Sequence, residues 1–303
     1  MTIPPPQTGV RVRGLRKSFR GFRTRHEVLR GIDLDLAPGE VVGLIGPNGA
    51  GKTTLMSCLL GFLHPDAGEI TFDGAANDDL GVRRRTGFVP ERMNFDHRAT
   101  GWAFLRYMAR LAGVPPGRTA GRVTAMLERL GIAHAAGRRL SHYSRGMLQR
   151  IGMCQALIHE PSYLFFDEPT SGLDPNGVLL VRDLISEQKA RGAAVLLNSH
   201  QLSEVEKVCD RVLFLNDGVI ARAETLRHLD RIVVAITLLG DSFDAAAVER
   251  IAGAPPRGNL IIATVETEGE IAEVVRELVE SGAGVIEVRR HTADLEGIFR
   301  GAA

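Results

Sequence analysis

The sequence of 303 residues is poor in cysteine, in net charge and in long apolar runs. Its three cysteines are Cys58, Cys154 and Cys209, and none belongs to a CxxC pair. An odd count without that spacing indicates neither a disulfide framework nor a zinc site. We interpret the three as small buried apolar residues in a chain suited to a reducing cytosol.

Charge and hydropathy exclude further classes of protein. The 37 basic and 36 acidic residues give a net charge of +1, which argues against nucleic-acid binding driven by overall charge, so no nucleic-acid partner is expected. The longest apolar run, residues 232–239, is far shorter than the roughly 20 residues of a membrane-spanning helix. The first residues also lack the pattern of a signal peptide. If the protein works at a membrane, we expect another chain to hold it there.

The length suggests about two domains. Residues 1–9 form a loose tail in this interpretation, and residues 10–226 form an α/β domain with a mainly parallel sheet, because predicted strands alternate with helices. Residues 10–15 alternate between apolar and polar and predict a strand at a sheet edge. A helical insertion is expected at about 92–160, where Trp102, Leu105 and Met108 repeat every three residues. Residues 230–303 read as strand, helix, strand, helix, strand, a small α+β domain.

The most informative stretch is GPNGAGKTT at residues 46–54, between an apolar strand pattern and a helical one. Glycine tolerates positive φ and lets the backbone approach an anion closely, and the new helix directs its positive end at the same anion. Lys52 then places its charge on the β- and γ-phosphates of a nucleotide, and Thr53 offers a hydroxyl to Mg²⁺. The alternative is a chance glycine turn before a helix.

Two further stretches fit phosphate chemistry. Asp167 and Glu168 follow the apolar run 163–166, and they suit Mg²⁺ binding and activation of the attacking water, respectively. The alternative is a solvated acidic turn. Ser144 and Gly146 begin a helix and predict a second anion site through backbone N–H groups. The alternative there is an ordinary serine N-cap.

Together these motifs resemble the ATP-binding subunit of ABC transporters. GPNGAGKTT matches the Walker A motif, and YSRGM at 143–147 stands where the LSGGQ signature belongs. YLFFDEP at 163–169 matches Walker B, SGLD at 171–174 matches the D-loop, and Ser199-His200 matches the switch histidine. The resemblance covers about residues 8–225, and it implies the P-loop ATPase fold of the ABC type.

The resemblance also implies roles for single residues. ATP would be bound by the loop residues Gly46, Pro47, Asn48, Gly49, Ala50, Gly51, Lys52, Thr53 and Thr54. Phe19 would stack on adenine, with Phe22 the weaker candidate and core packing the alternative. His200 would contact the γ-phosphate, although a lone histidine at a strand end is usually a surface residue.

A second copy of the chain is implied as well. Ser144, Gly146 and Met147 would bind the γ-phosphate of ATP held by the other copy's Lys52, and Asp174 would support the partner's site. One chain carries one phosphate loop and one signature, so each complete site requires two chains.

Three residues depart from the family pattern. Glu91 occupies the position of the Q-loop glutamine, where it can still approach Mg²⁺ but adds negative charge. Arg145 and Met147 replace the second glycine and the glutamine of LSGGQ, a variant that looks like that of ABC-2-type exporters. The basic run 83–85 is interpreted as solvated.

These observations predict an ATPase subunit of an exporter that works with a separate transmembrane permease at the cytoplasmic face of the membrane. Residues from about 88 to 112 would contact the permease. The alternative is a soluble ABC ATPase acting on ribosomes or DNA. The single cassette, the short insertion and the near-zero net charge disfavour that alternative.

Overall fold

The structure is a computed structural model that describes residues 8–21, 25–226, 232–240, 243–253, 255–256 and 258–290. The chain divides into two compact units, Met1–Glu224 and Thr225–Ala303. Among the described residues, no helix has both the length and the apolar character needed to cross a bilayer.

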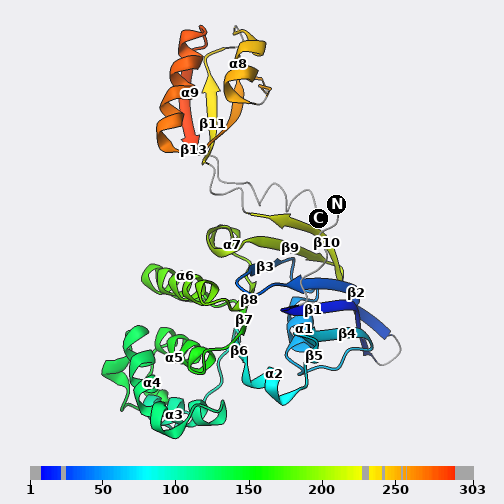
Figure 1. Ribbon diagram of the computed structural model, residues 1–303, viewed down its shortest axis with the longest axis vertical. Helices are drawn as coiled ribbons and strands as arrows, with labels where there is room; N and C mark the ends of the chain where they lie inside the picture. Colours follow the sequence, from blue (N-terminus) through cyan, green and yellow to red (C-terminus); the bar gives the residue numbers. More distant parts are fainter. Residues whose placement is uncertain are drawn as a thin grey trace. The chain divides into compact units, whose positions relative to one another are not determined.

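A six-stranded sheet forms the centre of the first unit (Figure 1). Its order is β10-β9-β3-β8-β7-β6, and neighbouring strands from β6 to β9 are parallel. All residues of β3, β7 and β8 are buried, as expected for strands covered on both faces. The predicted α/β fold with a mainly parallel sheet is confirmed. The strands are β3 (Val41–Ile45), β6 (Thr86–Val89), β7 (Tyr163–Asp167), β8 (Ala194–Asn198), β9 (Arg211–Asn216) and β10 (Val219–Thr225).

A second sheet is antiparallel and has the order β2-β1-β4-β5. Its strands are β1 (Val10–Arg20), β2 (Arg25–Leu36), β4 (Ala67–Phe72) and β5 (Ala75–Ala76). The prediction of an edge strand at residues 10–15 is wrong, because Val12 of β1 pairs with Leu34 on one side and with Ile70 on the other. Alternation along a strand reports which face is buried, and it carries no information about whether both edges are paired.

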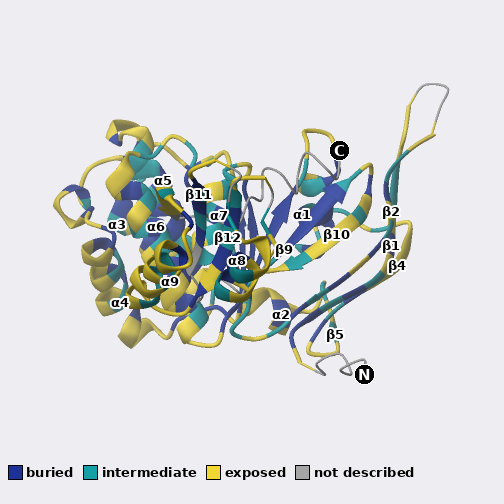
Figure 2. Ribbon diagram, turned by 90° about the horizontal axis from the view of Figure 1, so that it is seen from above, coloured by how far each residue is buried: buried dark blue, intermediate teal, exposed yellow. Residues whose placement is uncertain are grey.

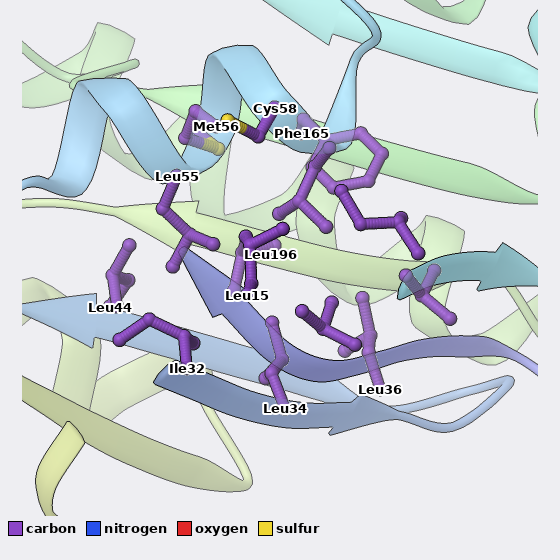
Figure 3. Packing of buried hydrophobic residues seen from close by; sticks show 14 of the residues in the cluster. Leu15, Ile32, Leu34, Leu36, Leu44, Leu55, Met56, Cys58, Phe165 and Leu196 are labelled. Atoms are coloured by element: carbon purple, nitrogen blue, oxygen red, sulfur yellow. The ribbon is translucent and has the colours of Figure 1, made fainter. Parts of the chain in front are cut away.

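The main core fills the space between the two sheets and helix α1 (Lys52–Leu59). Figure 3 shows Leu15 and Ile32 of the antiparallel sheet near Leu44 of β3 and Leu55 of α1. All four side chains are 0% exposed. Because β3 and α1 are both fixed in this core, the loop that joins them is held at both ends.

The expected helical insertion consists of α3 (Gly101–Leu111), α4 (Pro116–Arg129) and α5 (Arg145–Leu157). These helices lie on the opposite side of the six-stranded sheet from the antiparallel sheet (Figure 1), and their outer faces are exposed (Figure 2). Leu105, Val123 and Ile151 are buried between them. The remaining helices of the unit are α2 (Leu80–Arg84), α6 (Pro175–Ala190) and α7 (Leu202–Val208).

The described residues of the second unit form a three-stranded antiparallel sheet of order β12-β11-β13 and two helices. Val234, Ile236 and Leu238 of β11 are buried together with Ile261 and Leu278. This unit therefore has a hydrophobic core of its own. Its elements are β11 (Ile232–Leu238), α8 (Ala245–Ala252), β12 (Leu260–Val265), α9 (Glu268–Glu280) and β13 (Val285–Arg290).

Candidate functional site

The loop between β3 and α1 has the backbone geometry that its glycines predict. Gly49 and Gly51 have φ angles of +86° and +108°, a region that side chains other than glycine rarely occupy. At Gly46 a Cβ atom would lie 2.1 Å from the carbonyl oxygen of Leu215. Each of these three positions therefore requires glycine, for conformation or for close approach.

Lys52, the first residue of α1, folds back over this loop. Its Nζ donates hydrogen bonds to the carbonyl oxygens of Gly46 at 2.6 Å and Pro47 at 3.0 Å. Burial lowers the pKa of Lys52, and the negative charges of Glu168 and Asp167 oppose that change. The ammonium group is thus held at the mouth of the loop with acids nearby, where an anionic ligand can take over its hydrogen bonds.

Asp167 and Glu168 stand at the carboxyl end of β7. Asp167 is 8% exposed, and burial, assisted by the charge of Glu91, raises its pKa. Glu168 has a φ of +50°, and its N–H donates to the Asn198 carbonyl at 2.9 Å. A residue other than glycine in this strained region is often found at a functional site.

These residues line one pocket of about 350 Å³, which we term the phosphate-loop pocket. It brings Lys52 and Thr53 together with three acids from two different parts of the chain. The lining residues are Val28, Asn48, Gly49, Gly51, Lys52, Thr53, Thr54, Glu91, Asp167, Glu168 and Asn198.

The donor set of this pocket fits Mg²⁺. The described residues include no group of three or more His, Cys, Asp or Glu side chains that could hold a metal ion. Mg²⁺ is usually held by one or two carboxylates with waters and phosphate oxygens as its other ligands. The Thr53 hydroxyl and the carboxylates of Asp167 and Glu91 supply such a partial set. A cation there would offset the energetic cost of burying the charged Asp167 carboxylate.

The predicted histidine, His200, contacts one of the residues of this pocket. Its Nδ1 lies 2.7 Å from Oε2 of Glu168, while its side chain is 65% exposed. The contact joins the carboxyl ends of β7 and β8, which are neighbours in the sheet. The predicted switch histidine and the predicted catalytic glutamate are therefore in direct contact.

The residues of the YSRGM stretch line a different pocket of about 410 Å³, which we term the signature pocket. Ser144 caps α5 by accepting a hydrogen bond from the Met147 N–H at 3.3 Å. Asp174 caps α6 in the same way, accepting from the Gly177 N–H at 3.0 Å. The lining residues are Gly131, Ile132, His134, Ser144, Gly146, Met147, Arg150, Gly172, Leu173 and Asp174. None of them lines the phosphate-loop pocket.

Arg145 lies against the D-loop. A Cβ atom added to Gly172, whose φ is +72°, would lie 2.7 Å from Cζ of Arg145. The residue that departs from the signature pattern therefore packs on the backbone of SGLD in the same chain.

Some predicted residues lie outside both pockets. Phe19 is 42% exposed, which excludes core packing, and Lys17 Nζ lies over its ring at 5.6 Å from the centroid. Phe22 lies outside the described residues. Gly46 and Pro47 contribute carbonyl groups to Lys52, and Ala50 is buried at 4% exposure behind the loop.

Two residues that form hydrogen bonds to the Asp167–Pro169 segment were not predicted from the sequence. Asn198 lines the phosphate-loop pocket and donates a hydrogen bond from Nδ2 to Oδ1 of Asp167. Gln149 of α5 is buried and donates to the Pro169 carbonyl at 3.1 Å, next to Glu168. A polar residue ending the apolar run 194–197 was the available signal for Asn198.

Comparison with known proteins adds independent evidence. Residues 29–171 match the model of the family described as ABC transporter. An uncharacterised ABC transporter ATP-binding protein of Nostoc is 42% identical over 220 residues, 71% of this chain and 66% of that protein, so the match spans just under two thirds of the relative's length. The methionine import protein MetN of Bordetella avium is 37% identical over 71% of this chain and 62% of its own length.

Two matches extend over nearly the whole chain. The daunorubicin resistance ATP-binding protein DrrA3 of Streptomyces coeruleorubidus is 34% identical over 96% of this chain and 95% of its own length. A solved ATP-binding subunit of an ABC transporter is 27% identical, with a TM-score of 0.67 over 90% of this chain and 100% of that one. The chain therefore belongs to the ABC transporter family, among its ATP-binding proteins.

Proposed function

We propose that two copies of this chain bind and hydrolyse ATP to drive transport through a separate membrane permease. The observation that carries the proposal is the convergence of Lys52, Thr53, Asp167 and Glu168 on one pocket. A phosphate-binding loop, oxygen ligands for Mg²⁺ and a base for water are the parts that phosphoryl transfer to water requires.

The residues divide the work as follows. Lys52 exchanges its two backbone carbonyl partners for phosphate oxygens when a nucleotide enters. Thr53, Asp167 and Glu91 would hold Mg²⁺, which neutralises phosphate charge when it is bound. Glu168 accepts a hydrogen bond, and then a proton, from the attacking water. His200, 2.7 Å from Oε2 of Glu168, orients that carboxylate and leaves Oε1 for the water.

The dimer follows from the separation of the two pockets. Ser144 and Gly146 present the N-terminus of α5, a natural anion site, but they share no pocket with Lys52 of their own chain. We infer that the signature pocket of one copy closes on the nucleotide held by the other copy. Asp174 lies at the same surface and supports the partner's site.

An apolar groove of about 370 Å³ supports a permease as partner. It is lined by Phe88, Met93, Phe95, Met108 and Leu111, which fall in the range 88–112, and Leu111 is 65% exposed. Phe62, which is 67% exposed, lines the same groove, and exposed apolar residues gathered at a polar-rimmed groove mark an interaction site. The segment around Glu91 borders this groove, so it can transmit closure of the ATP site to the permease. The permease would in turn hold the chain at the cytoplasmic face of the membrane.

Export is the direction we propose. DrrA3 matches the second unit of this chain as well as the first, whereas the match to MetN covers 71% of the chain. The YSRGM form of the signature supports the same assignment. Action on ribosomes or DNA is not favoured, because the relatives described above are named as transporter or resistance proteins.

The test is Glu168→Gln, with the exposed Glu128→Gln on α4 as the matched control. Loss of the base should slow ATP hydrolysis on the order of 10²–10⁴-fold while ATP binding is kept, so an ATP-bound dimer accumulates. Steady-state hydrolysis and light scattering after size exclusion measure both effects. Unimpaired hydrolysis by Glu168→Gln, or equal slowing in the control, would overturn the proposal.

A further inference from the structure

Asn198 is a polar residue at the end of an otherwise apolar strand. It is the last residue of β8, it is 3% exposed, and it lines the phosphate-loop pocket. In the parallel register of β7 and β8 it stands directly opposite Asp167. A buried carboxamide is retained in a core only where its hydrogen bonds are used.

Asp167 and Glu168, the two acids at the end of β7, both bond to this one residue. Nδ2 of Asn198 donates to Oδ1 of Asp167, and the Asn198 carbonyl accepts the Glu168 N–H at 2.9 Å. Any residue type at position 198 could form the backbone contact, because that contact uses only the main-chain carbonyl. The side-chain contact requires a donor of this length at this position, so it is the part that depends on asparagine.

We propose that Asn198 is a positioning residue that fixes the carboxylate of Asp167 for Mg²⁺-nucleotide binding; the inference rests on the proposed ATP function. With Oδ1 held by the amide, the carboxylate rotamer is set and Oδ2 is presented in one direction. Without that donor, the Asp167 carboxylate can turn toward other partners, because Lys52 and two further acids line the same pocket.

A second feature of the same side chain agrees with this role. Among the described residues, Oδ1 of Asn198 is one of the few buried side-chain atoms without a hydrogen-bond partner. The amide cannot be reversed to satisfy it, because Oδ1 would then face a carboxylate oxygen. An acceptor left free beside a polar pocket is available to a hydrogen-bond donor that arrives with the ligand, such as a water molecule of a hydrated cation.

The position is distinct from that of an ordinary structural asparagine. Asn77 also donates from Nδ2, to the Cys58 carbonyl at 2.7 Å, but it does not line the phosphate-loop pocket. Losing the Asn77 amide removes its hydrogen bonds to the Cys58 and Leu59 carbonyls, so the control loses at least as many hydrogen bonds from the folded chain as Asn198→Ala does. Only the loss of Asn198 should change how the pocket responds to Mg²⁺.

The test compares Asn198→Ala with Asn77→Ala in binding trinitrophenyl-ATP without turnover. For Asn198→Ala we expect the Mg²⁺ concentration at half-maximal binding to rise at least fivefold, with affinity in EDTA unchanged within twofold. Asn198→Ser, which keeps a donor on a shorter side chain, should lie between it and the wild type. Asn77→Ala should match the wild type in both conditions.

Thermal unfolding of each variant separates folding from positioning. If Asn198→Ala does not fold, Asn198→Leu keeps the branched shape of the side chain without its donor and should show the same shift in Mg²⁺ dependence. Wild-type Mg²⁺ dependence in a folded Asn198→Ala or Asn198→Leu protein would overturn the inference alone. A wild-type protein that fails to bind the nucleotide at any Mg²⁺ concentration would overturn the proposed function with it.

Discussion

The phosphate-loop pocket and the signature pocket are each built at the start of a helix, α1 and α5 respectively. They differ in what surrounds that helix end. The first has a lysine and three acids facing one space. The second has Ser144 and Asp174, but each already caps a helix of its own chain, and it has no lysine among its lining residues.

Under the proposed function, this difference explains why the phosphate-loop pocket holds the nucleotide and the signature pocket only completes the site. Phosphate binding, metal binding and water activation are all available in the phosphate-loop pocket. The signature pocket adds only an anion-binding helix end and the Arg150 guanidinium. In the proposed function the two pockets are therefore unequal halves of one site, joined when two chains meet.

Of the variants that compare the two pockets, Lys52→Ala should have the largest effect on ATP binding. A hydrogen bond to a charged group contributes about 1.5–3 kcal/mol, so ATP affinity should fall roughly 10- to 100-fold. Ser144→Ala should leave ATP binding to the isolated chain unchanged, because the signature pocket is not part of that chain's own phosphate-binding site. Isothermal titration measures both, with the exposed Lys207→Ala as control. Equal losses for Lys52 and Ser144 would remove the distinction between the pockets.

His200→Ala should have a smaller effect, about tenfold on kcat, which corresponds to about 1.4 kcal/mol. The imidazole holds one oxygen of Glu168 but is not among the residues that line the phosphate-loop pocket. The KM for ATP should stay within about twofold, since Lys52 and Thr53 are intact. His64→Ala, an exposed histidine on the other side of the core, serves as control. A rise in KM with no change in kcat would contradict the assignment.

Gly172→Ala tests the signature pocket and should have the smallest effect, about a threefold loss of ATPase activity. Its Cβ would displace the Arg145 guanidinium at a backbone position with positive φ, whose strain costs about 1–2 kcal/mol. Gly192→Ala shares the strain, at φ +86°, but has nothing within 4 Å of the added atom. Similar ATPase losses in the two variants would show that the Arg145 contact has no role.

Much of the phosphate-loop pocket could be predicted from sequence, because its parts are local. A loop with three glycines between a strand and a helix, or two acids after an apolar run, sets its own geometry. The wrong prediction concerned pairing: Val10, Val12 and Leu15 indicate a buried face in the sequence, yet one of the two neighbours of β1, strand β4, comes from residues more than 50 positions away.

Asn198 could not be assigned for the same reason. The role of Asn198 depends on its position opposite Asp167 in the register of β7 and β8. These two strands are separated in the sequence by helix α6. The packing of Arg145 on Gly172 is likewise a contact between two motifs that the sequence presents as separate. The sequence indicates the chemistry of each motif, and the fold shows which motifs contact each other.

The most direct measurement mixes two inactive variants, Glu168→Gln and Ser144→Arg. Each alone should lack ATPase activity, because both of its sites carry the defect. In a mixed dimer both defects fall on the same composite site, and the second site has an intact Glu168 from one chain and an intact Ser144 from the other. We expect mixing to restore ATP hydrolysis well above the sum of the separate proteins. No recovery, in a mixture shown to form mixed dimers, would contradict the composite site.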